Sequence, residues 1–537
     1  MNRKENIDKL RNSSFDLLII GGGITGAGIA LDAASRGLKV ALVEKSDFAY
    51  GTSSRSTKLI HGGLRYLKQL EFGLVKEVGS ERAVVHKLAP HLVVPEKMLL
   101  PLYEKRGFGS LLTSIGLKLY DWLAGVKPED QRRMLTRNQT LKQEPLLKAD
   151  DVKGGAIYAE YRTDDARLTI ELIKTAAQFG ACVVNYCEVS NFEYKDNKIC
   201  GVTVADHVSN SSFTIKATVV VSAAGPWVDT LREINKSKKG KRLHLTKGVH
   251  LVVSHKKFPV HQAIYFDVED GRMIFAIPRG EITYVGTTDT NYQGGIDEVH
   301  TSKEDAVYLV NAVNRTFPAV NLTLADIESS WAGLRPLIHE EGKSASELSR
   351  KDEIFESDTG LISIAGGKLT GYRKMAERVV DLVMENYFED QETPCKTEEI
   401  RFIGSDFENY KQVAEYITLV SKQLEPLKLS GRASYLVNNY GKQTDIIISK
   451  LVAGQSENSN IALAKAELSF CFNYEMVERP EDFFIRRTGL LYFNRPLLEI
   501  ILNPLLDEFK KHFNWTDEQM RAEEHKMNVF IRGVNNF

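Results

Sequence analysis

Residues 16–44 read DLLIIGGGITGAGIALDAASRGLKVALVE, and this stretch decides the fold. The pattern predicts a buried strand over 16–20, a glycine turn over 21–26, a helix to about residue 36 and a second strand over 40–43. The second strand ends on an acid, Glu44. Strand, glycine turn, helix, strand and acid follow one another as a βαβ dinucleotide-binding unit requires. A glycine turn that binds nothing is the alternative, and the surrounding elements count against it.

Each part of this unit has a physical role in holding a dinucleotide. Gly21 permits the tight turn, Gly23 lets the backbone approach a pyrophosphate, and Gly26 lets the helix pack closely on the strand. The helix N-terminus offers N–H groups and partial positive charge to the phosphates. Glu44 can accept hydrogen bonds from the adenosine ribose.

Later segments favour FAD over NAD as the dinucleotide. Residues 51–58, GTSSRSTK, are rich in hydroxyls that can bond a pyrophosphate or a ribityl chain. A strand over 219–224 runs into Gly225, and another over 361–365 runs into GGKLT, followed by a helix over 372–387. A second helix N-terminus can stabilise the negative charge that a reduced flavin develops. Taken singly, these segments could be a polar loop, a helix C-cap or a bend.

Three longer motifs resemble those of the FAD-dependent glycerol-3-phosphate dehydrogenases. They are SRSTKLIHGGLRYL at 54–67, WAGLRPL at 331–337 and GGKLTGYR at 366–373. Supporting matches are GTTD at 286–289, TKGVH at 246–250 and RPEDFFIRRT at 479–488. The resemblance covers the catalytic region and extends into the C-terminal part.

The resemblance implies an α/β, Rossmann-like and D-amino-acid-oxidase-like FAD-binding domain, an antiparallel β substrate domain and a C-terminal α-helical domain. It also implies oxidation of sn-glycerol 3-phosphate to dihydroxyacetone phosphate, with electrons passed to membrane quinone. The enzyme is expected to be cytoplasmic and bound peripherally to the inner face of the cell membrane.

The predicted cofactor-binding residues come from the glycine turns, the acid after the second strand and the hydroxyl-rich and HGG segments. They are Gly21, Gly23, Ile24, Thr25, Gly26, Glu44, Lys45, Thr52, Ser53, Ser54, His61, Gly62, Gly63, Ala224, Gly225, Gly366, Gly367, Lys368, Leu369 and Thr370.

The substrate carries a dianionic phosphate, which arginine binds well through its bidentate fork. The matching motifs offer Arg65, Arg335 and Arg350. Arg335 lies in the apolar run AGLRPLI, where an unpaired charge would be costly and a bound anion would offset that cost. Tyr66 and Thr288 could add neutral hydrogen bonds. For any single arginine, a surface side chain is the alternative.

Catalysis needs a base for the hydroxyl proton and a charge that stabilises the developing alkoxide. His61 is the preferred base, because an unperturbed imidazole titrates near neutral pH. A structural histidine in the cofactor site is the alternative role for His61, and His250 and His339 are weaker candidates for the base. Lys368 on the last glycine turn, with Arg335, is predicted to stabilise the alkoxide or the anionic flavin.

Composition excludes several other classes of function. The formal net charge of −1 indicates no nucleic-acid partner. The 5 cysteines form no CxxC pair, which argues against zinc and disulfides, and no metal is expected. The N-terminus lacks the apolar core of a signal peptide, and no stretch approaches the roughly 20 apolar residues of a membrane span. Residues 108–126 are apolar with basic flanks, which fits an interfacial membrane segment, a quinone route or a buried core helix equally well.

The chain is long enough for more than one domain. The predicted division is a discontinuous FAD-binding domain (1–90, 150–230 and 345–390), a substrate-binding domain (91–149 and 231–344) and a C-terminal helical domain (391–537). Strands at 249–253, 263–267, 273–277 and 283–287 indicate an antiparallel sheet. The helical domain shows no catalytic constellation, and a cap, a homodimer surface and a partner-docking role are open.

Three rival functions share parts of this pattern. A glycerol-3-phosphate oxidase using O₂ would carry the same motifs, although no extra insertion is evident in the substrate domain. An amine or amino-acid oxidase would need fewer cations than this chain offers. A non-enzymatic flavin protein would need neither the base nor the phosphate anchors.

Overall fold

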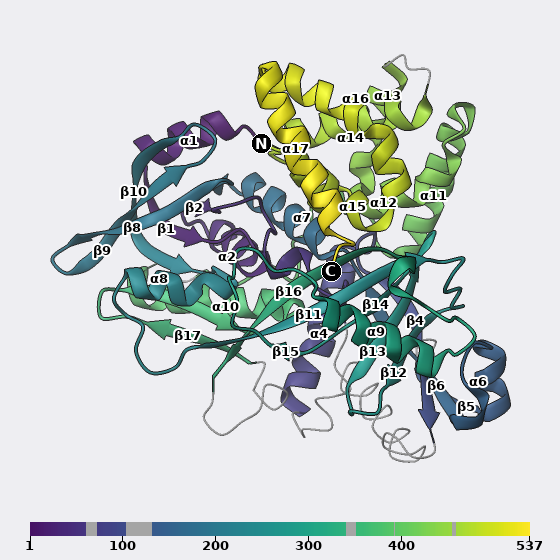
Figure 1. Ribbon diagram of the computed structural model, residues 1–537. Helices are drawn as coiled ribbons and strands as arrows, with labels where there is room; N and C mark the ends of the chain where they lie inside the picture. Colours follow the sequence, from purple (N-terminus) through teal and green to yellow (C-terminus); the bar gives the residue numbers. More distant parts are fainter. Residues whose placement is uncertain (61–71, 104–130, 340–350, 391–392, 454–457) are drawn as a thin grey trace.

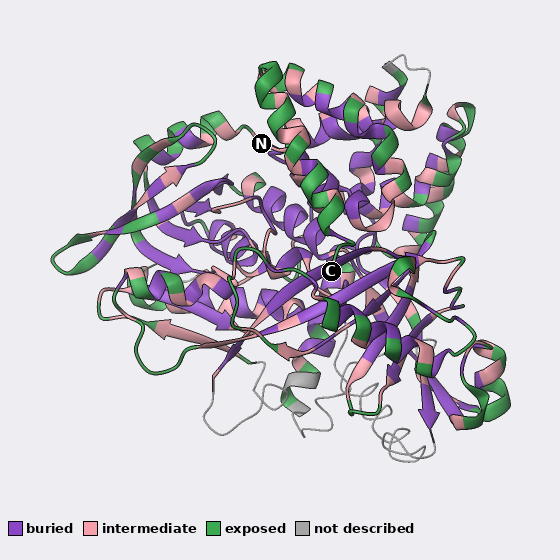
Figure 2. Cartoon of the chain, viewed as in Figure 1, coloured by how far each residue is buried: buried purple, intermediate pink, exposed green. Residues whose placement is uncertain are grey.

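The computed structural model describes residues 1–60, 72–103, 131–339, 351–390, 393–453 and 458–537. Figure 1 shows an N-terminal α/β part around one sheet, a second sheet beside it, and a group of C-terminal helices packed over both. Most strands of the two sheets are buried, while exposure gathers on the outer faces of the helices (Figure 2).

The first sheet, sheet A, has the strand order β17-β18-β10-β1-β2-β7, with β9 pairing β10 and β8 pairing β9. Strands β1, β2, β7, β10 and β18 run parallel to their neighbours in this core. Their near-continuous runs of Val, Ile and Leu suit strands that are covered on both faces. The bounds are β1 Ser14–Ile20, β2 Val40–Val43, β7 Cys182–Val184, β8 Cys187–Lys195, β9 Lys198–Asp206, β10 Ser211–Ser222, β17 Asp352–Glu356 and β18 Leu361–Gly366.

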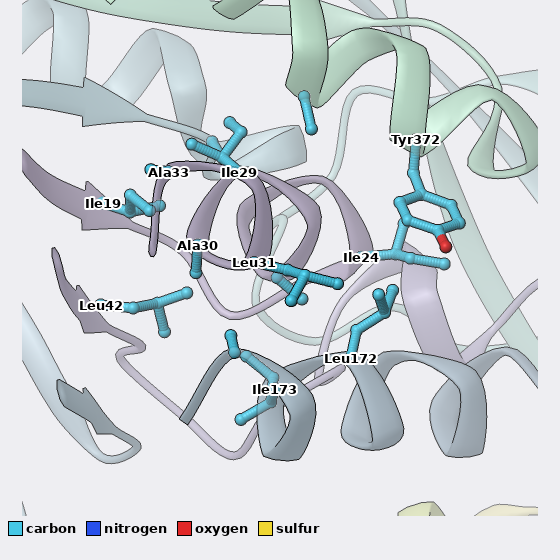
Figure 3. Close-up of a cluster of buried hydrophobic side chains, with 14 of the residues drawn as sticks. Ile19, Ile24, Ile29, Ala30, Leu31, Ala33, Leu42, Leu172, Ile173 and Tyr372 are labelled. Carbon is cyan, nitrogen blue, oxygen red and sulfur yellow. The ribbon is translucent and has the colours of Figure 1, made fainter. Parts of the chain in front are cut away.

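Helix α2 (Ile24–Ser35) is the centre of the largest hydrophobic core and packs between α7 (Asp165–Gln178) and α10 (Tyr372–Tyr387). Figure 3 shows Leu172 and Ile173 of α7 on one side of α2 and Tyr372 of α10 on another. Small residues let the helices approach: a Cβ at Gly28 would lie 2.9 Å from the Tyr372 ring. Segments far apart in sequence therefore fix the position of the helix that follows the first glycine turn.

The second sheet, sheet B, has the order β15-β11-β14-β13-β12-β4-β6-β3, with β16 pairing β11 and β5 pairing β6. The pairs are antiparallel except for β12 with β4. The predicted antiparallel sheet is thus confirmed. The bounds are β3 Leu59–Ile60, β4 Val94–Tyr103, β5 Arg133–Thr136, β6 Val152–Arg162, β11 Leu243–Ser254, β12 Ala263–Asp267, β13 Met273–Arg279, β14 Ile282–Gly286, β15 Thr290–Asn291 and β16 Ile327–Ile338.

The C-terminal part is helical and has its own buried core. Its helices are α11 Tyr410–Leu424, α12 Ala433–Tyr440, α13 Thr444–Ala453, α14 Ser459–Tyr474, α15 Leu490–Phe493, α16 Arg495–Phe513 and α17 Asp517–Gly533. The predicted capping box between Thr516 and Gln519 is present at the start of α17. A π-helical turn, η10 (Asp482–Arg487), interrupts this pattern. The remaining helices are α1 Arg3–Asn12, α4 Phe72–Leu88, α6 Arg137–Gln143, α8 Val228–Ile234 and α9 Lys303–Thr316.

Two details differ from the sequence prediction. Strand β10 spans Ser211–Ser222 and not 219–224: it begins earlier than predicted, and it ends earlier because Ala224 caps the short helical turn η4 (Gly225–Trp227). Strands β3 and β6 fall in ranges assigned to the FAD-binding domain but pair within sheet B. The division into domains stays a prediction. The apolar segment 108–126 lies outside the described residues.

Within the ranges given above, none of the helices has the length and apolar character that a bilayer crossing needs. The same ranges hold no group of three or more His, Cys, Asp or Glu side chains arranged to bind a metal ion.

Candidate active site

Four neighbouring strands of sheet A end at one edge. Ile20 of β1 pairs with Val43 of β2 and with Ser222 of β10, and Ser222 pairs with Ser363 of β18, all in parallel register. The segments that follow these strands are therefore neighbours, namely the first glycine turn, Glu44, the 224–225 turn and the 366–370 turn. The carboxyl ends of parallel strands are where open α/β sheets bind their ligands.

The first glycine turn accepts only residues without a side chain at two positions. Gly21 has a φ of +117°, and a Cβ there would lie 2.7 Å from the carbonyl oxygen of Ala223. A Cβ at Gly26 would lie 1.9 Å from the carbonyl oxygen of Gly21. The turn is thus tight and close to its neighbours, as a pyrophosphate cradle at a helix N-terminus requires.

Glu44 fastens the turn from the end of β2. Its Oε2 accepts a hydrogen bond of 2.7 Å from the Gly22 N–H, and its Oε1 accepts one of 2.9 Å from the Ser46 N–H. Burial raises the pKa of the Glu44 carboxyl, although these two backbone bonds oppose the rise. Ser53 Oγ accepts from the Ile24 N–H at 3.0 Å, so the hydroxyl-rich segment meets the first turn of α2. The glycine cradle, the acid and the hydroxyl are in one place, and they fit an adenine dinucleotide.

Lys45 and Thr52 tie this edge to sheet B. Lys45 forms an ion pair with Asp297, whose carboxylate also accepts a 2.8 Å bond from the Trp227 Nε1–H. Thr52 Oγ1 donates to the carbonyl of Leu334 at 2.8 Å. Asp297 is a site residue that the sequence did not reveal, because it lies in a loop with no recognisable motif.

Ser54 is buried, and its carbonyl accepts a 3.2 Å bond from Lys58 Nζ. Two residues further, the carbonyl of Ser56 accepts a 3.1 Å bond from the Trp331 indole N–H. The hydroxyl-rich segment is therefore held along its length by side chains of sheet B and by its own lysine.

His250, a weaker candidate for the base, is buried at 1% exposure. Its Nε2 lies 3.0 Å from Thr57 Oγ1, and its ring stacks on Trp331 with centroids 4.7 Å apart. Burial lowers the pKa of His250 well below its usual value, and the charges of Arg335 and Lys58 add to this. A stacked, neutral histidine of this kind supports the 54–58 segment by packing. His339, the other candidate, is half-buried near His244, with ring centroids 6.4 Å apart.

The second and third glycine turns also have left-handed backbone. Gly225 has a φ of +53°, and Gly366 and Gly367 both have a φ of +75°. A Cβ at Gly366 would lie 2.6 Å from the Lys351 carbonyl oxygen. The chain then passes through Lys368 into a short 3₁₀ turn, Leu369–Gly371, directly before α10.

Arg335 projects from β16 and already has an ionic partner. Its Nη1 lies 3.2 Å from Asp289 Oδ1 and donates to the Thr288 carbonyl at 3.3 Å, and its Nη2 donates to Thr287 Oγ1 at 2.9 Å. The sequence argument assumed an unpaired Arg335 charge that a bound anion would offset, but Asp289 already pairs with this side chain, and a contact of Arg335 with substrate stays a prediction. The sequence carried a signal for Asp289, since the GTTD motif ends on it.

The glycines of the supporting motifs make room for these side chains. A Cβ at Gly248, in the TKGVH motif, would lie 2.4 Å from Arg335 Nη2. A Cβ at Gly286 would lie 2.1 Å from His250 Cδ2. Thr288 is 1% exposed, and its hydroxyl accepts a 3.0 Å bond from the Val249 N–H. That hydroxyl thus holds β11, and a contact with substrate stays a prediction.

Six predicted site residues lie outside the described residues. They are His61, Gly62, Gly63, Arg65, Tyr66 and Arg350.

Comparison with known proteins agrees with this geometry. The family of FAD-dependent oxidoreductases matches residues 16–373, and the C-terminal domain of alpha-glycerophosphate oxidase matches residues 395–520. The chain is 49% identical over 538 residues to the aerobic glycerol-3-phosphate dehydrogenase of Bacillus subtilis, covering 99% of this chain and 97% of that protein. It is 51% identical over 541 residues to the enzyme of the same name from Staphylococcus aureus, with the same coverage of 99% and 97%.

A solved structure shares the whole fold. The glycerol-3-phosphate dehydrogenase from Bacillus halodurans, complexed with FAD, aligns with a TM-score of 0.85 and 43% identity, covering 99% of this chain and 98% of that one. The FAD-binding edge of sheet A, the antiparallel sheet B and the helical C-terminal part are together those of one family. This chain belongs to the family of FAD-dependent glycerol-3-phosphate dehydrogenases.

Proposed function

We propose that this protein oxidises sn-glycerol 3-phosphate to dihydroxyacetone phosphate, with FAD as the electron acceptor. The observation that carries the proposal is the placement of Arg335. Asp289 and Thr287 orient this cation, which lies on β16. The preceding residue of the same strand, Leu334, accepts a hydrogen bond from Thr52 of the predicted cofactor segment through its carbonyl. A fixed, partly exposed guanidinium beside a dinucleotide edge suits a phosphorylated substrate.

The reaction removes two electrons and two protons from the substrate. Bound FAD would supply the acceptor for the hydride from C2. The hydroxyl proton passes to a base, for which His61 is proposed. Lys368, on the turn that precedes α10, is proposed to stabilise the alkoxide oxygen as the proton leaves. The carbon–hydrogen and oxygen–hydrogen bonds break, and a carbonyl forms at C2.

Several cations are proposed to share the phosphate. Arg335 is joined by Arg65 and Arg350 through the matching motifs, with Tyr66 and Thr288 as neutral donors. One positive group orients a carboxylate adequately, whereas a dianionic phosphate binds more tightly with two or three. This distinguishes the proposed substrate from amino acids, whose oxidases share only the fold.

Membrane quinone is proposed as the final electron acceptor, with the enzyme bound peripherally to the inner face of the cell membrane. The word "aerobic" in the names of the relatives from Bacillus subtilis and Staphylococcus aureus is consistent with this acceptor.

The proposal is tested by mixing the purified yellow protein with sn-glycerol 3-phosphate under argon and following the flavin absorbance. Rapid bleaching with this substrate, and none with glycerol or glycine, is the expected result. Bleaching by glycine alone would identify an amino-acid oxidase, and no bleaching of the FAD-loaded protein by any of them would contradict an enzymatic role.

A glycerol-3-phosphate oxidase is the second candidate, because the matching C-terminal family is that of alpha-glycerophosphate oxidase. The solved L-alpha-glycerophosphate oxidase from Mycoplasma pneumoniae is 19% identical with a TM-score of 0.55, which shows a shared fold alone. Reoxidation of the bleached enzyme distinguishes the two. A quinone analogue should restore the colour much faster than air for a dehydrogenase, and air should suffice for an oxidase.

A further inference from the structure

The π-helical turn η10 of the C-terminal part lies against the loop that follows Glu44. Arg487 binds Asp47 of this loop with both terminal nitrogens, at 2.7 Å and 2.9 Å, and Arg486 forms a second ion pair with the same carboxylate. The side chains of Asp47 and Arg487 are both 0% exposed. A π-turn inside a helical region is uncommon and frequently accompanies a functional site.

Asp47 is linked to the first glycine turn through the two residues that follow it. Phe48 beside it packs on the first glycine turn, where a Cβ at Gly22 would lie 2.7 Å from Phe48 Cδ1. The next residue, Ala49, donates a 3.0 Å backbone bond to the Gly22 carbonyl and has a left-handed φ of +62°. The Glu44 carboxylate accepts a hydrogen bond from the N–H of the same glycine. A displacement of Asp47 would therefore move both Glu44 and the glycine turn.

The buried Asp47 carboxylate is ionised and surrounded by hydrogen-bond donors. Burial opposes its ionisation, but the charges of Arg487 and Arg486 outweigh burial and hold the pKa of Asp47 below its usual value. Asn185 donates to the same carboxylate at 3.1 Å and to the Met476 carbonyl of the C-terminal part at 2.9 Å. The loop is thus bound by direct and bridged contacts to residues far along the chain.

A second C-terminal contact supports the hydroxyl-rich segment. Phe493 of α15 meets Trp331 edge to face, with ring centroids 5.7 Å apart, and Trp331 donates to the Ser56 carbonyl. The ammonium of Lys58 lies 5.9 Å from the centre of the Phe493 ring. Both segments that follow the second strand of the dinucleotide unit are therefore braced from the same C-terminal part.

We propose that the C-terminal helical part is a positioning element for FAD, acting through η10 on the loop that carries Glu44. Arg486 and Arg487 are positioning residues: they touch Asp47 and act on the cofactor through it. The inference depends on FAD binding alone and is independent of the substrate proposed above.

The test is the dissociation of FAD from the holoenzyme, followed by flavin fluorescence on dilution well below the melting temperature. Arg487→Met should raise the dissociation constant for FAD at least tenfold. Arg167→Met is the matched control, because Arg167 is 1% exposed and pairs with Glu475 across the same interface, where Glu475 also contacts Arg487, whereas the Asp47 carboxylate is bound by Arg486 and Arg487. The control should lower the melting temperature but change the FAD dissociation constant by less than twofold.

The ratio of the two dissociation constants decides the matter. A ratio of five or more supports positioning through Asp47. A smaller ratio overturns the proposal, because FAD loss would then follow from general loosening of the interface. Arg487→Lys, which keeps the charge but loses the bidentate fork, serves if Arg487→Met does not fold, and it should give a ratio of three or more against Arg167→Lys. With excess FAD, the KM of Arg487→Met should return to within twofold of the parent value.

Discussion

Two arginine–carboxylate pairs, one between the C-terminal part and the loop after β2 and one in sheet B, differ in their contact with water. The Arg487–Asp47 pair is closed, with both side chains 0% exposed. The Arg335–Asp289 pair is open, at 23% and 14% exposure. The same kind of arginine–carboxylate pair thus occurs in this chain once as a buried structural contact and once as a partly exposed contact that solvent or a ligand can reach.

The difference in exposure predicts different energetic roles. Removing one member of a closed pair leaves an uncompensated charge in a low-dielectric interior, which is strongly destabilising. An open pair contributes little to stability, because water screens it. A guanidinium in such a pair remains in contact with water and can exchange that water for an anionic oxygen. Mutations in the closed cluster should therefore mainly lower stability, whereas mutations in the open pair should mainly lower substrate affinity.

The largest effect is expected at the centre of the closed cluster. Glu475 is 0% exposed and binds Arg167 at 2.7 Å and Lys174 at 3.0 Å. Glu475→Gln should lower the free energy of unfolding by about 3–5 kcal/mol, because Arg167, Lys174 and Arg487 lose one of their buried counter-charges and keep only Glu171 and Asp47. Urea denaturation measures this, and the KM of the folded variant should equal that of the parent. A loss below about 1 kcal/mol would show that the cluster is better solvated than its burial indicates.

The next effect should fall on catalysis alone. Arg335→Gln is expected to lower kcat/KM for sn-glycerol 3-phosphate about 100-fold, since a charge-assisted contact with phosphate is lost. The melting temperature should change by no more than a few degrees. Arg315→Gln is the control, because Arg315 pairs with Glu269 at the surface, at 63% and 58% exposure. Equal activity of Arg335→Gln and the control would remove Arg335 from the substrate site.

A smaller effect sharpens the distinction between binding and orienting the substrate. Asp289→Asn leaves Arg335 in place with its bond to Thr287 but removes the opposing charge. We expect the KM to change by about 3–10-fold with little change in stability, as is typical of a partly exposed pair. Steady-state kinetics measures this, and a fall in melting temperature as large as that of Glu475→Gln would show that the pair is not open.

The smallest effect concerns an acid near the closed cluster that lacks a strong cationic partner. Burial, followed by the charge of Asp482, raises the pKa of Glu481 to about 7. A raised carboxyl pKa means that stability is full below the unfolded pKa of about 4.3 and declines as pH rises towards 7. Glu481→Gln should therefore stabilise the protein on the order of 1 kcal/mol at pH 8 and by almost nothing at pH 4. Melting temperatures at the two pH values check this, and equal shifts would contradict it.

The dinucleotide half could be predicted from the sequence in detail. Its elements are local, and its key positions are glycines whose backbone geometry is dictated within a few residues, such as Gly21 and Gly26. The parallel strands are continuous apolar runs, and the order of strand, glycine turn, helix, strand and acid along the chain predicted a dinucleotide-binding unit. Both ends of β10 were misplaced, because residues 223–224 remain apolar after the strand has turned away, while its first half, residues 211–218, alternates polar and apolar side chains.

The ionic partners could not be predicted in the same way. Arg335 and Asp289 come together because β16 pairs with β11 and the 287–289 segment follows β14, and such cross-strand register is not written in a local pattern. Asp47 and Arg487 are further apart in the chain still. The motif around Arg487 was noticed, yet its role in holding a loop near the other end of the sequence appears only in three dimensions.

The strand order of sheet A has a consequence for how the enzyme is made. Strand β1, which is synthesised well before the other two, lies next to β10, which in turn lies next to β18, whose last residue is Gly366. The strands of the cofactor edge therefore cannot all pair until β18 has followed β1 out of the ribosome, which takes roughly 20–70 s at typical elongation rates. Until then the first glycine turn lacks the other turns of the site beside it, and the side of β1 that pairs with β10 has not joined the complete sheet. The supply of FAD should therefore matter only after β18 has been synthesised, and a cell short of flavin would accumulate finished but unloaded chains.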